Sequence, residues 1–267
     1  MMYLSRKMFG CSFLLVVAVM LSSPGPGLSQ KRISRLINAR SPIPTVTQIV
    51  ERFIQAVGGR VAWSNIKTQH GVGTMRVLGS RGEGTFEVFV KTPNKSLAVF
   101  ALGQGLFKKG FDGEKSWTQT PTESPKYDGP DVQAISRRDS DSLAYLHFHE
   151  RFPKARVTGV EKIEESNAYT IDAIPVDEKL PIKLYFNVES GLLVRRDTII
   201  LDAAGKPKVT TQYYDDYREV GGFKFAYRIR TNQGNAIVVG TITEMKINQP
   251  MEDAIFNLPT YIPAITN

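Results

Sequence analysis

The stretch "YYDDYREVGGFKFAYRIRT" (residues 213–231) alternates bulky apolar and basic side chains after a Gly-Gly pair. Successive side chains on a strand point to opposite faces, so this spacing predicts a strand that is buried on one face and exposed to solvent on the other. Gly221 and Gly222 predict the turn that leads into it. The residues predicted to share the covered face are Phe223, Phe225, Tyr227 and Ile229.

The same two-residue period appears in "EGTFEVFVK" (83–91), where Phe86, Val88 and Val90 share one face, and in "PIKLYFNV" (181–188) and "NAIVVGTITEMKI" (235–247). Short turn signals separate these runs. Asp112–Gly113 is a strong one, because both residues tolerate positive φ. We interpret this pair as a hairpin turn and not as the site of a functional Asp112 carboxylate. "LAVFAL" (97–102) is apolar on both faces, which predicts cover on two sides.

Helical periodicity is confined to two places. "TVTQIVERFIQAVGG" (45–59) predicts a helix capped by Thr45 or Thr47 and ended at Gly58, and "RVAWSNIK" (60–67) predicts a second short turn of helix. Residues 129–152 predict one broken helix or two short ones. About four strands should precede this insert and six or seven should follow it. We therefore expect a mainly β (α+β) fold: a strongly curved, incomplete antiparallel barrel with an N-terminal helix pair and a helical insert as plug or lid.

The ends of the chain predict the domain organisation. Residues 1–29 have the charged, apolar and small-residue parts of a signal peptide, and the apolar run of 14 residues is shorter than the ~20 needed to span a membrane. This predicts export to the periplasm, with an uncleaved inner-membrane anchor as the alternative. Residues 30–44 are expected to be a basic, Pro-containing tether, 45–259 a single domain, and 260–267 a tail.

Composition excludes several kinds of chemistry. The single cysteine, Cys11, lies in the leader, so the mature chain has no thiolate ligand, disulfide or cysteine nucleophile. The formal charge of +8 becomes +6 once Arg6 and Lys7 leave with the leader. A mild basic excess either favours an anionic membrane surface as a partner or serves solubility. An exported chain with so short a basic-aromatic stretch is not expected to bind nucleic acid.

Candidate catalytic groups are few. His147 and His149 would point apart on a helix, and only His70 could join them, so we expect no metal site. Asp215 and Asp216 are neighbours that would face opposite ways on a strand. No nucleophile elbow or phosphate-binding glycine loop is present. We therefore predict a protein that is not an enzyme and needs no cofactor.

The apolar strand faces instead predict either a ligand cavity or a filled core, which periodicity does not distinguish. If a cavity forms, its wall is predicted to consist of Phe86, Val88, Val90, Phe223, Phe225, Tyr227 and Ile229. Leu143 and Leu146 on the insert would form part of the lid.

The chain also resembles a known family. The opening helix ending in Gly-Gly, the "KTPNKSLAVF" turn, the "GFDGEKSW" hairpin and the "DYREVGGFKFAYRI" strand pair are similar to those of the LolA/LolB-like (lipoprotein-localisation) superfamily, over roughly residues 45–258. The resemblance implies an open half-barrel with a helical lid over an apolar cavity, and a role in binding or carrying lipids or lipoproteins in the periplasm. No position here matches a specific ligand-binding arginine of that family.

The sequence thus favours a non-catalytic periplasmic carrier whose partners are lipid or lipoprotein acyl chains. The alternative is an envelope scaffold or stress-sensing module that binds a protein partner, along a sheet edge or an exposed patch.

Overall fold

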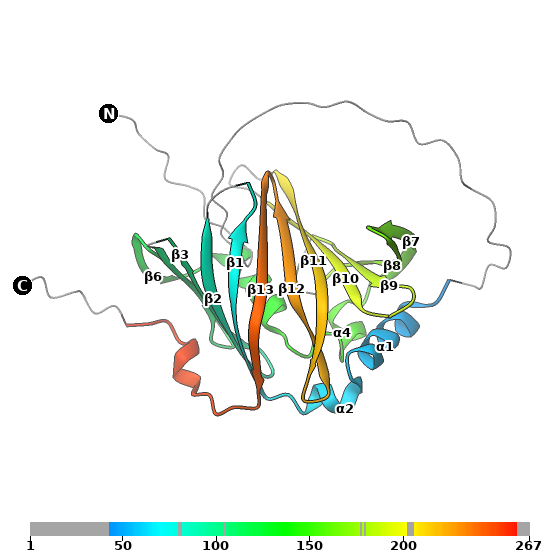
Figure 1. Cartoon of the computed structure of the whole chain (residues 1–267), viewed down its shortest axis with the longest axis horizontal. Coiled ribbons are helices and arrows are strands. Elements are labelled where there is room, and N and C mark those ends of the chain that lie inside the picture. The colour runs from blue at the N-terminus through cyan, green and yellow to red at the C-terminus, as the bar shows by residue number, and fades with distance from the viewer. Residues whose placement is uncertain are drawn as a thin grey trace, which may run out of the picture.

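The computed structural model describes residues 43–79, 82–103, 105–176, 178, 180–201 and 206–260. Within them the chain forms one antiparallel sheet of 13 strands, curved around several short helices (Figure 1). The predicted curved, incomplete barrel is therefore confirmed. The predicted leader, Cys11, most of the tether and most of the C-terminal tail lie outside the described residues.

The sheet consists of two meanders that meet at its centre. The first contains β1 (Thr68–Val77), β2 (Glu83–Lys91), β3 (Lys95–Leu102), β4 (Gly105–Phe111), β5 (Ser116–Thr120) and β6 (Glu123–Tyr127). The second contains β7 (Arg156–Ile163), β8 (Ser166–Ala173), β9 (Ile182–Asn187), β10 (Leu193–Leu201), β11 (Pro207–Val220), β12 (Phe223–Gln233) and β13 (Ala236–Ile247). β1 pairs with β13, so β6 and β7 become the two edges of the sheet.

The strand count before the insert differs from the prediction, because the described residues form six strands there in place of about four. β5 and β6 have five residues each, too few to show a clear alternation. The turn between β4 and β5 is the predicted hairpin. Asp112 Oδ1 accepts hydrogen bonds from the backbone N–H groups of Glu114 and Lys115, and Gly113 has φ = 107°. The carboxylate of Asp112 is thus used within the turn.

The helices α1 (Val46–Ala56), α2 (Gly59–Ser64), α3 (Pro130–Ser140) and α4 (Phe148–Arg151) form where helical periodicity predicted them. The 3₁₀ helix η1 (Asp253–Phe256) was not predicted. Thr45 caps α1 in a capping box with Gln48, and Gly58 (φ = 129°) allows the chain to turn into α2. The predicted insert is the pair α3 and α4, which lies behind the sheet in Figure 1.

One half of the concave side is filled by side chains. Phe53 of α1 contacts the rings of Trp63, Tyr145 and Phe186 at centroid distances of 5.0–5.8 Å, and Trp63 contacts Phe223 at 5.1 Å. Aliphatic residues of α1 and of β8–β10 complete this cluster, which we call the filled core. Close-packed aromatic rings of this kind contribute much of a domain's stability.

The convex side of β3 is covered, as the doubly apolar "LAVFAL" run predicted. Leu97 and Val99 pack there with Trp117 and Phe256 of η1, while Ala98 and Phe100 point to the concave side. Trp117 is buried, and its Nε1–H donates to the carbonyl oxygen of Phe256 at 2.7 Å. The C-terminal segment therefore holds β3 and β5 from outside.

Candidate functional site

The concave face of the central strands carries an apolar wall. Met75 and Val77 of β1 and Val238 of β13 are buried together, with Phe86 of β2 and Phe100 of β3 packed against them. Within the described residues, no helix contributes to this cluster, which we call the apolar wall. Glycine makes room for this packing, because a Cβ at Gly73 would clash with the carbonyl oxygen of Thr241 and with the ring of Phe86.

The residues predicted as a cavity wall separate into two groups. Phe86, Val88, Val90 and Ile229 are half-buried on the concave face of β2 and β12, and Val88 lies between Ala98 of β3 and Gly71 of β1 in the strand register. These side chains extend the apolar wall.

Phe223 and Phe225, in the second group, lie near the helices. Phe223 is buried against Trp63, and Phe225 is half-buried, packed against the filled core and 4.8 Å from Phe223. Tyr227 is also buried, and the guanidinium of Arg218 lies 4.7 Å from its ring centre.

The predicted lid residues, Leu143 and Leu146, pack against the filled core. Their segment is tied down, because Trp63 Nε1–H donates to the carbonyl of Ser142 at 2.9 Å and Arg60 donates to the carbonyl of Leu146 at 3.2 Å. α3 is the part of the insert that lies against the first meander, near β3 and β5. It is attached by Gln133 to β5 and by Ser140, whose hydroxyl lies 2.6 Å from that of Ser96 on β3.

A second wall of the concave side is polar. Arg196 of β10, Gln212 of β11 and Thr231 of β12 are direct neighbours in the strand register, and Thr198 and Thr210 form the next pair along β10 and β11. We call these five residues the polar wall. Sequence reasoning missed it, although one signal was present: two adjacent arginines in the strand "LVRRDT" (193–198) must face opposite sides of the sheet, so one of them must point inward.

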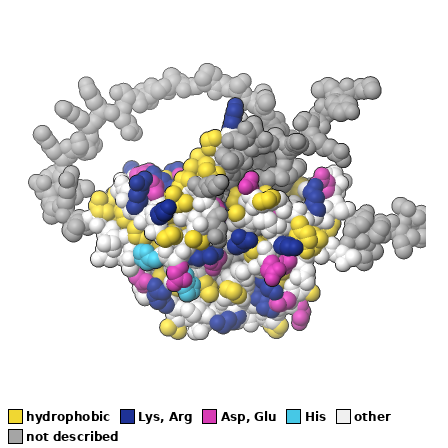
Figure 2. All heavy atoms as spheres, turned by 180° about the vertical axis from the view of Figure 1, so that it is seen from behind, with side chains coloured by type: hydrophobic (Ala, Val, Ile, Leu, Met, Phe, Trp, Pro, Cys, Tyr) yellow, Lys and Arg dark blue, Asp and Glu magenta, His cyan; other side chains and the backbone are white. Residues whose placement is uncertain are grey.

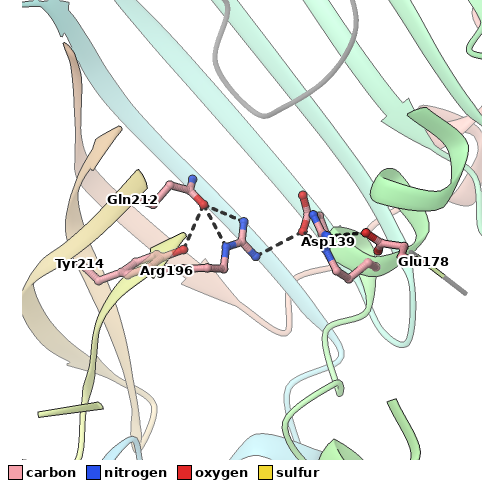
Figure 3. A network of polar contacts seen from close by, with 6 residues as sticks. Asp139, Glu178, Arg196, Gln212 and Tyr214 are labelled. Carbon is pink, nitrogen blue, oxygen red and sulfur yellow. Dashed lines mark hydrogen bonds and ion pairs between the residues drawn. The ribbon is translucent and has the colours of Figure 1, made fainter. Parts of the chain in front are cut away.

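An ion-pair network connects the polar wall to α3 (Figure 3). Arg196 donates through Nε and Nη2 to Gln212 Oε1 (3.1 and 2.7 Å) and through Nη1 to Asp139 Oδ1 (3.2 Å). Arg138, next to Asp139 on α3, donates to Asp139 (3.0 Å) and to Glu178 (2.7 Å). α3 is thus joined by buried charges both to β10 and to the loop before β9.

The carboxylate of Asp139 remains ionised. Burial alone raises the pKa of Asp139, but Arg138 and Arg196 more than offset this effect and hold the pKa at about 2. Burial also raises the pKa values of Tyr145 and Tyr214, which lie near the same charges. Asp139 is therefore a fixed negative charge near neutral pH.

The pocket beside α1 is small. A pocket of about 110 Å³ lies between α1 and the strands β8 and β9, lined by residues that include Gln48, Arg52, Tyr169 and Phe186. Sites for drug-sized ligands usually measure ~300–1,000 Å³. A long acyl chain therefore does not fit in this pocket. On the face shown in Figure 2, hydrophobic side chains are interspersed with charged ones.

The other candidates from the sequence have structural partners. His149 Nε2 lies 2.8 Å from the hydroxyl of Thr47, and His70 stacks on Phe89 with ring centres 4.3 Å apart. Asp216 forms an ion pair with Arg218 at 2.6 Å, and Asp215 lies opposite Arg228 in the register. In the described part of the chain, no three His, Cys, Asp or Glu side chains are grouped to hold a metal ion.

Comparison with solved structures identifies the fold. A LolA superfamily protein from Nitrosomonas europaea, NE2245, is similar over 80% of this chain and 98% of its own, with a TM-score of 0.55 and 14% identity. A DUF1329 family protein from Desulfovibrio piger is similar over 79% and 97%, with a TM-score of 0.54 and 11% identity. A putative outer membrane lipoprotein-sorting protein domain from Vibrio parahaemolyticus is similar over 79% and 95%, with a TM-score of 0.52 and 11% identity.

The fold is therefore the LolA/LolB-like half-barrel that the sequence motifs suggested. No family model and no curated protein matches the chain. None of the helices in the described residues has the length and apolar character needed to cross a membrane.

Proposed function

We propose that this protein is a non-catalytic binding or carrier protein for a lipid, an acyl chain or a lipoprotein. The observation that supports this proposal is the row of half-buried apolar side chains on the concave face: Phe86, Val88, Val90 and Ile229, next to the apolar wall. The cargo's hydrocarbon would lie along these strands, and α3 would border it. The similarity to LolA-type structures supports the same class of function.

The expected energetics fit an acyl chain. Burying each methylene releases about 0.8 kcal/mol before ordering costs, so a dozen methylenes release roughly 10 kcal/mol. Half of that value already corresponds to a dissociation constant between about 1 mM and 1 μM. The apolar wall itself requires no charge to be buried.

We place this function in the periplasm. Support comes from the signal-like residues 1–29 and from the fold shared with a lipoprotein-sorting domain. The basic excess of the chain would favour transient contact with an anionic membrane surface during loading or release.

The alternative function, capture of a protein partner along a sheet edge, has less support. β6 contains Pro125, which lacks an N–H donor, and β7 has an irregular register between Val157 and Gly159. Proline and bulges at edges are features that discourage pairing with another strand.

The test is native mass spectrometry of the full chain purified from an envelope fraction, followed by titration with palmitate. We expect a co-purified lipid, and we expect Val88→Asp to abolish palmitate binding. Val239→Asp is the matched control, because Val239 is a half-buried valine on the opposite face of the central sheet, between Arg76 and Arg230. Equal binding by both variants would remove the concave wall as the site, and a protein adduct in place of a lipid would support the scaffold function.

A further inference from the structure

The polar wall contains hydroxyl groups that lack partners. Thr210 and Thr231 are 3% and 2% exposed, and their Oγ1 atoms have no hydrogen-bond partner in the described part of the chain. Most buried polar side-chain atoms in proteins are hydrogen-bonded, so an unpaired buried hydroxyl needs an explanation. Two of them on neighbouring strands, both on the concave side, indicate a place where an acceptor of hydrogen bonds is bound.

A permanent positive charge lies beside these hydroxyls. Gln212 is opposite both Thr231 and Arg196 in the strand pairing, so the guanidinium and the two hydroxyls line one region of β10–β12. The anion that neutralises Arg196 is Asp139, which comes from α3 and not from the sheet. A buried arginine without an anion is strongly unfavourable, so a ligand that displaces Asp139 must bring a negative charge of its own.

The polar wall also adjoins the apolar wall. Thr231 is paired directly with Val238, whose side chain is fully buried in the apolar wall. A molecule that contacts both regions must have a hydrocarbon part and a polar end separated by the width of about one strand. This is the geometry of a single-chain or multi-chain amphiphile.

We propose that the cargo is an anionic amphiphile, whose carboxylate or phosphate group is bound by Arg196 and by the hydroxyls of Thr210 and Thr231. Arginine suits this role because its planar fork donates parallel hydrogen bonds to two oxygens of either group. In the unliganded protein Asp139 forms the ion pair with the Arg196 guanidinium, and the cargo's anion takes its place on binding. This inference rests on the proposed lipid-binding function and specifies its ligand class.

The experiment compares three sixteen-carbon ligands on the full chain by calorimetry: palmitate, hexadecyl phosphate and neutral hexadecanol. We expect at least one of the two anions to bind tenfold or more tightly than hexadecanol. The anion that binds more tightly shows whether the natural head group is a carboxylate or a phosphate. Arg196→Gln should reduce this preference to about one. Asp139→Asn should strengthen anion binding, because it removes the competing internal charge.

Thr210→Val and Thr231→Val provide a second, independent readout. Each replaces an unpartnered hydroxyl by a methyl group of similar size, so each should leave the unliganded protein as stable as before or more stable. Each should nevertheless weaken anion binding several-fold and leave hexadecanol binding unchanged. A merely structural role for these threonines would not produce that separation.

The outcomes are distinct. Equal binding of the anions and hexadecanol, or an anion preference that survives Arg196→Gln, would overturn the inference and leave the lipid-binding function in place. Binding of none of the three ligands would overturn both.

Discussion

The two halves of the concave face are made from the same kind of strand, yet they are used differently. Near the helices, Phe53 of α1 and Trp63 of α2 pack together with Phe186 of β9 and fill the space. Across β1–β3 and β13, the ring of Phe86 lies close to Gly73, and the wall is built from strands alone within the described residues. The first arrangement stabilises the domain, and the second forms the surface that we propose as the binding site.

The largest expected effect tests this division directly. Phe186→Ala should lower the free energy of unfolding by about 3–5 kcal/mol, because Phe186 is fully buried in the filled core and leaves a cavity there. Phe86→Ala should cost clearly less, since Phe86 is only half-buried, but it should weaken palmitate binding. Urea unfolding measures the first quantity and calorimetry the second. Equal stability losses in the two variants would show that both halves are filled cores.

The next effect concerns the ion pair that joins α3 to the sheet. Asp139→Ala should destabilise the protein by about 3 kcal/mol, because it leaves the Arg196 and Arg138 guanidinium groups without their shared anion. Arg137→Ala on the same helix is the control, because Arg137 is exposed and its loss should change stability by less than about 0.5 kcal/mol. Similar values for the two variants would mean that α3 is held by its other contacts.

Acid should release the same connection. The folded-state pKa of Asp139 is about 2, below its usual value of 3.8, so its ionised form stabilises the fold. This contribution, on the order of 2 kcal/mol, should be fully present above pH 4 and lost as the pH falls from about 4 toward 2. Unfolding free energies between pH 2 and 5 should therefore fall more steeply for the native chain than for Asp139→Asn. Parallel curves would contradict the assigned ion pair.

The smallest effect belongs to the helical half. Thr45→Ala removes the side-chain cap of α1 and should cost about 1 kcal/mol. Palmitate affinity should not change, because Thr45 lies on neither concave wall. A change in affinity without a change in stability would mean that the N-terminal end of α1 takes part in binding.

Several features of the fold were predictable because they depend on neighbours in the chain. The alternation in 223–231 defined a strand, Thr45 and Gly58 marked the ends of the first helix, and Asp112–Gly113 defined a hairpin. Short strands such as β5 and β6 were missed, since five residues give too weak a pattern. The resemblance motifs led to the correct fold because they are local elements in the right order.

The candidate site was predicted only in part, for a related reason. Periodicity placed Phe86 and Phe223 on covered strand faces, but it contained nothing to say that Phe223 would meet Trp63 of α2 while Phe86 would lie across Gly73. Likewise "LVRRDT" required one inward arginine without telling which one, or that Asp139, 57 residues away, would neutralise it. Side-chain direction along a strand is a property of consecutive residues. What a buried face meets depends on contacts between distant segments, and only the folded sheet with its helices decides those.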